Sequence, residues 1–426
     1  MPAEAAAPPH GGAASLVGAT ALATLLLGLV LQRHGLAFGP DAWTSWTASV
    51  SLLEGRGYCD AHGLVVHEWP PLYSLWLAAV QAVAGVSVAS VRLADAIAAA
   101  VFAALACAAA LRQVPEVRER WPVALAAATP ALLALRGPSS EHVMHAALFA
   151  LLLAVQGWQA AARPGPRAVA LAAGALALAA AVATRHAALV FVPAAVLLLA
   201  STRCRPRRER AVAAAVIAGP ALLLAAWIRA AFEQGAATTL FSSTREPLAT
   251  AATMLRAVGE DLAPFPFGIA AWLFSVVWFA RAARHPDTPD HRGAVAFVVV
   301  ALLGTFALFQ LVHVADEPKG RFVRFAGVIV GTLLVARVAA LPQPRWRVAL
   351  LLVLLLPNVL RAGKHVVVGR QGCDTVTEHG GESWLPLRAT WRPGLAAGTV
   401  TTDGCVAVEA PLFRWQRQRM QVERPR

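Results

Sequence analysis

The sequence predicts an all-α polytopic membrane protein with about eleven transmembrane helices, within a range of about 10–13. Of its 426 residues, 58% are hydrophobic and 14% are charged, whereas a soluble domain is about half apolar and about a quarter charged. The apolar residues also form blocks of about 15–25 that contain almost no charge. Within a block the apolar character is continuous rather than alternating, which excludes a transmembrane β-barrel. Helices therefore remain as the structure that satisfies the backbone in lipid.

The apolar blocks define the predicted spans and, with them, the domains. The spans are 13–31, 88–111, 121–135, 141–162, 168–184, 187–200, 211–231, 265–280, 293–313, 325–341 and 348–360. Residues 1–12 have no basic stretch typical of a signal peptide, so we expect a cytoplasmic N-terminus followed by a retained anchor. Residues 13–360 form the transmembrane domain, and 361–426 form a small extracytoplasmic tail.

The formal net charge of +13 arises mainly in short loops between spans. The arginine-rich loops are 112–120, 163–167, 201–210, 281–292 and 342–347. All of them lie in the cytoplasm, as the positive-inside rule requires, if the borderline segment 70–86 does not cross the membrane. We therefore expect an interfacial or re-entrant helix there, with Trp69, Tyr73 and Trp76 at the interface. No soluble basic domain is left to hold a duplex, which argues against a nucleic-acid partner.

This topology gathers the isolated polar residues at the outer face, mainly in the long loop 32–87, in the loop 232–264 and at several helix ends. Arginine can bind a phosphate through two hydrogen bonds, and a carboxylate can deprotonate a hydroxyl. Such a face suits a lipid-phosphate substrate whose tail stays in the bilayer. The outer polar residues are Asp41, Glu54, Arg56, Asp60, His62, His67, Glu68, Arg92, Asp95, Glu141, His142, His145, Arg185, His186, Arg245, Glu246, Asp316, Glu317, Lys319, Arg321 and Arg324.

Structural roles compete with these functional ones. Arg92 and Asp95 lie three residues apart on a helix face and are expected to pair. Asp41 suits a helix N-cap, and the cations of 319–324 suit a helix end anchored among lipid headgroups. The five cysteines show no zinc spacing, and Cys373 and Cys405 of the tail are either paired or free.

The first loop resembles that of the GT-C fold glycosyltransferases, in particular the bacterial relatives of protein O-mannosyltransferases and aminoarabinose transferases. The similarity lies in Asp-Ala-x4-Thr-Ala-x3-Leu-Leu-Glu-Gly-Arg-Gly-Tyr from Asp41, followed by Pro-Pro-Leu-Tyr. Weaker similarities are Arg92-Leu93, Ser140-Glu141, Arg185 before a short span, and Lys319-Gly320-Arg321-Phe322. The sequence departs from the family where Ala42-Trp43 replaces a second acid and Phe322 replaces a tyrosine.

The resemblance implies an enzyme of the bacterial inner membrane that transfers a sugar from a polyprenyl-phosphate donor to an acceptor at the extracytoplasmic face. The acceptor is a protein, a glycolipid or an envelope polymer. The implied site residues are Asp41 as the catalytic carboxylate and Glu68, Tyr73, Glu141, Arg185, Lys319 and Arg321 as substrate-binding residues. Glu68 and Glu141 are also candidate ligands for a divalent cation. A flippase of a lipid-linked sugar and a non-catalytic partner in envelope assembly are the alternatives.

Overall fold

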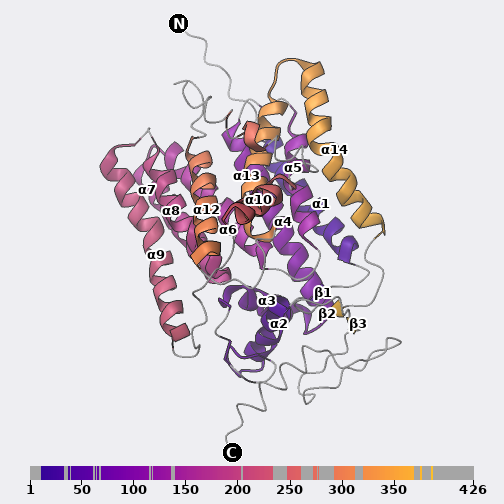
Figure 1. The fold of residues 1–426 in the computed structure, drawn as a ribbon, viewed down its shortest axis with the longest axis vertical. Coiled ribbons are helices and arrows are strands. Elements are labelled where there is room, and N and C mark those ends of the chain that lie inside the picture. The colour runs from indigo at the N-terminus through magenta and orange to yellow at the C-terminus, as the bar shows by residue number, and fades with distance from the viewer. Residues whose placement is uncertain are drawn as a thin grey trace, which may run out of the picture.

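The computed structural model describes residues 11–32, 37–38, 40–60, 63, 65–66, 69–114, 117, 119–135, 140–202, 205–233, 247–260, 272–275, 277, 292–311, 320–368, 375–376 and 385–386. These residues form a bundle of helices with two shorter helices, α2 and α3, at one end (Figure 1). The bundle helices are α1 (Gly11–Leu31), α4 (Val88–Gln113), α5 (Trp121–Ala134), α6 (Glu141–Ala160), α7 (Pro164–Thr184), α8 (Phe191–Ala200), α9 (Arg207–Glu233), α10 (Pro247–Glu260), α12 (Arg292–Leu311), α13 (Gly320–Ala339) and α14 (Pro344–Val368), with the 3-10 helix η2 (His186–Val190) before α8.

The prediction of a helical membrane protein is confirmed. Among the described helices, six are long and apolar enough to cross a bilayer: α1, α4, α6, α7, α9 and α14. The count of about eleven spans stays a prediction, because α5, α8 and α12 are shorter apolar helices and most of 265–280 lies outside the described residues. The last helix, α14, continues past the predicted span end at residue 360 to Val368.

Small side chains allow the bundle helices to pack closely. On α4, Ala99, Ala103, Ala106 and Ala110 recur every three or four residues and are all buried, so they lie on one face of the helix. They belong to the main apolar core, which also includes residues of α6. Alanine at such positions lets helix backbones approach closely, which is how van der Waals packing stabilises helices in lipid.

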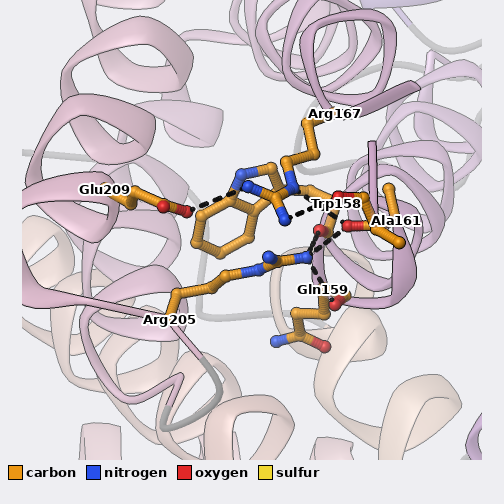
Figure 2. Close-up of polar contacts among 7 residues, drawn as sticks. Trp158, Gln159, Ala161, Arg167, Arg205 and Glu209 are labelled. Atoms are coloured by element: carbon orange, nitrogen blue, oxygen red, sulfur yellow. Dashed lines mark hydrogen bonds and ion pairs between the residues drawn. The ribbon is translucent and has the colours of Figure 1, made fainter. Parts of the chain in front are cut away.

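Two of the arginine-rich loops are joined to each other and to the end of α6 (Figure 2). Arg205 donates hydrogen bonds to the carbonyl oxygens of Trp158, Gln159 and Ala161, at 3.0, 3.0 and 2.5 Å. Arg167 donates to the Ala161 oxygen at 2.9 Å and pairs with Glu209 at 3.5 Å, which joins the loops 163–167 and 201–210.

A second ion pair lies between two other cytoplasmic loops of the predicted topology. Arg347 Nη2 lies 2.8 Å from Glu119 Oε1, which joins the loops 342–347 and 112–120. Both contacts are those expected if the basic loops share one side of the membrane. Because α6 has 20 residues, its two ends are separated by about 30 Å, the thickness of the hydrocarbon core.

The helices α2 (Pro40–Leu53) and α3 (Leu72–Ala84) lie at the opposite end of the bundle (Figure 1). With 13 residues, α3 is about 20 Å long, shorter than the about 30 Å hydrocarbon core. It contacts α2, α4 and the α7 helix. This length favours the interfacial placement predicted for segment 70–86.

The chain turns sharply directly after α2. Gly55 and Gly57 have positive φ angles of 73° and 84°, a conformation that other residues adopt at a steric cost. The hydroxyl of Tyr58 donates to the carbonyl oxygen of Trp69 at 3.0 Å, directly before α3. Burial raises the pKa of Tyr58 above its ordinary value, and a hydrogen bond with Ser74 opposes part of that rise.

A short three-stranded sheet joins the tail to the first loop. The strand β1 (Ala37–Phe38) pairs in parallel with β2 (Thr375–Val376), which pairs in antiparallel with β3 (Leu385–Pro386). Since β1 also contacts α2, this part of the tail lies at the α2 end of the bundle. Cys373, Cys405 and residues 405–420, where the sequence favours a helix, lie outside the described residues.

Candidate functional site

Three charged side chains from separate elements meet at the end of the bundle where α2 and α3 lie, and we call them the Glu141 cluster. Glu141 is the first residue of α6, Arg185 lies between α7 and η2, and Arg324 lies in α13. Arg324 Nη1 donates to Glu141 Oε2 at 2.6 Å. On the other side, Arg185 Nη1 lies 3.9 Å from Glu141 Oε1. The carboxylate therefore lies between two guanidinium groups.

Local structure explains how each member reaches the cluster. An acidic residue in the first turn of a helix is stabilised by the positive end of the helix dipole, which suits Glu141 in α6. The chain at Arg185 is extended, with φ −152° and ψ 133°, so α7 ends there and η2 begins. This break in the helix is tolerated at the end of an apolar segment because protein surrounds it.

Burial gives the Glu141 cluster its chemical character. The side chains of Glu141 and Arg185 are each 7% exposed and that of Arg324 is 17% exposed. Together the three side chains bear two positive charges and one negative charge. Charges taken out of water interact strongly, and a guanidinium group is well suited to bind a phosphate through paired hydrogen bonds. The cluster can therefore orient two arginines toward an anionic group.

Two buried histidines lie beside the cluster on α6. His142 Nε2 lies 3.1 Å from the carbonyl oxygen of Ala131. His145 stacks on Phe102, with ring centroids 5.2 Å apart, and lies within electrostatic range of both arginines. The described residues contain no group of three His, Cys, Asp or Glu side chains able to hold a metal ion. Glu68, the second candidate ligand for a cation, lies outside the described residues, so the cation stays a prediction.

The helix that bears Asp41 shares an apolar cluster with α3, α4 and the start of α6. Asp41 lies in the first turn of α2, where the structure describes the main chain. Its neighbour Ala42 is buried in an apolar cluster with Trp46 and Tyr73, and Val143 of α6 packs against the same cluster. This apolar cluster therefore links α2, which bears Asp41, to the start of α6, where Glu141 lies.

The other predicted site residues have different positions. Tyr73 is buried on α3, and its hydroxyl donates to Asp95 Oδ1 of α4 at 2.9 Å. Arg321 lies in the first turn of α13, where its main chain is described, and Lys319 lies outside the described residues. The expected pairing of Arg92 with Asp95 stays a prediction.

Of the predicted substrate-binding residues, Glu141 and Arg185 are brought together. The residue that sequence reasoning missed is Arg324, which it listed among the outer polar residues but not among the substrate-binding residues. The available signal was that Arg324 lies three residues after Arg321, which was a predicted substrate-binding residue. Residues three apart share a helix face.

Comparison with solved structures identifies the fold. No family profile matches the chain, and no characterised sequence matches it. ArnT from Cupriavidus metallidurans, bound to undecaprenyl phosphate, is similar with a TM-score of 0.55 and 16% identity, over 80% of this chain and 62% of that chain. The oligosaccharyltransferase of Archaeoglobus fulgidus in the apo form is similar with a TM-score of 0.52 and 12% identity, over 82% and 56% of the two chains.

A second structure from the same archaeon is also similar to this chain. The oligosaccharyltransferase AglB, in complex with an inhibitory peptide and a dolichol-phosphate, gives a TM-score of 0.50 with 11% identity. These proteins are GT-C glycosyltransferases, so the predicted GT-C fold is confirmed. The matched region spans about three fifths of the ArnT chain and a little over half of the oligosaccharyltransferase chain.

Proposed function

We propose that this protein is an integral membrane glycosyltransferase that moves a sugar from a polyprenyl-phosphate-linked donor to an acceptor at the extracytoplasmic face of a bacterial inner membrane. The observation that supports it most is the buried Glu141 cluster at the end of a GT-C bundle, beside the helix that bears Asp41. The ArnT structure bound undecaprenyl phosphate and the AglB structure contained a dolichol-phosphate. A lipid phosphate is therefore the substrate class that fits both the fold and two buried arginines.

In the proposed reaction the arginines serve the leaving group. Arg185 and Arg324 hold the phosphate of the donor, and Lys319 and Arg321 also take part in substrate binding. As the bond between the anomeric carbon and the phosphate oxygen breaks, its electron pair goes to that oxygen. Fixed positive groups stabilise this developing charge more in the transition state than in the bound donor. Glu141 orients the two guanidinium groups.

Asp41 acts on the acceptor. Its carboxylate takes the proton of the acceptor hydroxyl while the hydroxyl oxygen forms a bond to the anomeric carbon in a single displacement with inversion. Glu68 assists acceptor binding or holds a divalent cation. The acceptor is a protein, a glycolipid or an envelope polymer, and the polyprenyl chain of the donor stays in the surrounding lipid.

The test is sugar transfer from a panel of polyprenyl-phosphate donors in membranes that contain wild type, Asp41→Asn or Arg185→Met at matched protein levels. We expect transfer by wild type and none by Asp41→Asn, with donor binding retained in Asp41→Asn and weakened in Arg185→Met. Glu119→Gln, which removes an ion pair at the other end of the bundle, serves as the control and should transfer normally. Full activity of Asp41→Asn would refute the assignment of Asp41, and a wild type that moves donors across the membrane without transfer would indicate a flippase.

A further inference from the structure

The helix α2 bears the proposed base and has few direct bonds to the bundle. Within the described residues it contacts mainly α3 and β1. Its position relative to the Glu141 cluster therefore depends on how α3 is held. Side-chain hydrogen bonds join α3 to α4 near its start and to α2 near its end.

At its start, α3 is bonded to the bundle. The hydroxyl of Tyr73 donates to Asp95 Oδ1 at 2.9 Å, and Trp76 Nε1 donates to the carbonyl oxygen of Ala94 at 3.1 Å. Both acceptors lie on α4, whose alanine face packs into the main core. The first turns of α3 are thus joined to one of the best-packed helices of the molecule.

At its end, α3 is bonded to α2. Gln81 Nε2 donates to Ser49 Oγ at 2.9 Å. The residues of the Tyr73–Asp95 bond and of the Gln81–Ser49 bond are each at most 2% exposed. Water therefore competes little for these hydrogen bonds, and a hydrogen bond is electrostatically stronger in a buried environment than in water. An apolar contact is tolerant of small shifts, whereas a hydrogen bond requires a defined distance and direction.

We propose that Tyr73 and Asp95 are positioning residues, which hold α3, and through it the α2 helix that bears Asp41, in place relative to the start of α6. This inference rests on the proposed function, and it gives Tyr73 an indirect role in place of substrate contact. An ionisable residue such as Asp95 inside a membrane domain is costly and is retained where it has a task. A shift of about 1 Å in a reacting group lowers a rate by about 100-fold, so a small displacement of α2 is enough to slow turnover.

The kinetic test compares Tyr73→Phe, Asp95→Leu and Asp95→Asn. Tyr73→Phe and Asp95→Leu remove the bond, and we expect kcat to fall by about 10- to 100-fold while KM for the donor changes by less than about 3-fold. Asp95→Asn keeps an oxygen that accepts from Tyr73, so it should retain kcat within about 5-fold of wild type. A raised KM with unchanged kcat in Tyr73→Phe would show that the hydroxyl binds substrate, which overturns the proposal.

Tyr58→Phe is the matched control. The chain has two tyrosines, and the hydroxyl of Tyr58 also donates a hydrogen bond, to the carbonyl of Trp69 rather than to α4. Its removal should leave kcat near the wild-type value. Equal losses in Tyr58→Phe and Tyr73→Phe would mean that any weakening of this loop slows the enzyme, and the bond to Asp95 would then have no special role.

A second readout does not depend on activity. In a background without the five native cysteines, Ala42→Cys and Val143→Cys place thiols on α2 and α6, and a short bis-maleimide reports how often the two approach. We expect the cross-linking yield to fall in Tyr73→Phe and to stay at the wild-type level in Tyr58→Phe. If wild type transfers no sugar, the proposed function fails, yet this yield still decides the positioning: a fall supports it and an unchanged yield overturns it.

Discussion

Neutralising Glu141 should destabilise the protein far more than neutralising a surface carboxylate. In Glu141→Gln two guanidinium groups remain around a neutral amide, with the former contacts at 2.6 Å to Arg324 and 3.9 Å to Arg185. At an effective dielectric constant of about 20, the lost attractions are about 6 and about 4 kcal/mol. Desolvation of the carboxylate offsets much of this, and breaking a buried pair by removing one partner has a net effect of about 3–5 kcal/mol.

The chain offers a control of the same chemistry. Glu119 pairs with Arg347 at 2.8 Å, but its side chain is 36% exposed, so Glu119→Gln should lower stability by only about 0.2–1 kcal/mol. Both variants can be compared with wild type by equilibrium unfolding in mixed micelles of rising dodecyl sulfate content, followed through the fluorescence of the 13 tryptophans.

A double-mutant cycle identifies the source of the loss. Arg324→Met alone removes one of the two cations, and in the double variant with Glu141→Gln the excess positive charge is smaller than in Glu141→Gln alone. We therefore expect the two effects to be non-additive by more than about 1 kcal/mol. If Glu141→Gln and Glu119→Gln were equally mild, or if the two losses at the cluster simply added, the view of a coupled buried charge cluster would be wrong.

Three further predictions concern separate parts of the molecule. Arg185→Lys keeps the charge and loses the planar fork, so kcat/KM for the donor should fall by about 10-fold in transfer assays. Burial raises the pKa of Tyr58, so in Tyr73→Phe, where it is the last tyrosine, tyrosinate absorbance should appear only above the ordinary value of about 10. The raised pKa belongs to the folded state, whereas the unfolded chain has the ordinary value of about 10. The free energy of unfolding should therefore fall as the pH rises from about 10 to the raised pKa of Tyr58, and Tyr58→Phe should remove this fall. Arg205→Met removes three carbonyl contacts, so hydrogen exchange at the end of α6 should accelerate, while the α2–α3 layer should exchange as in wild type.

Helix positions followed from the sequence because the signal for a membrane helix is local. A block of apolar residues such as 168–184 needs no partner to be recognised, since the bilayer itself is the solvent. The predicted spans 13–31, 88–111 and 168–184 correspond to α1, α4 and α7. Charge in the loops, read with the positive-inside rule, grouped the basic loops that the structure joins through Glu119 and Arg347.

The sequence by itself thus determined the class of protein, most of its helices and the kind of side chain available at one membrane face. Tertiary structure alone decided which of those side chains meet. Glu141 and Arg324 are separated by 183 residues along the chain. Their contact depends on how α6 and α13 pack within the bundle. In the same way, Tyr73 faces Asp95 rather than open solvent because α3 folds back on α4. The hydrophobicity of a helix can be read from one segment of the sequence. A buried charge cluster, and with it the arrangement of the site, depends on how distant segments pack.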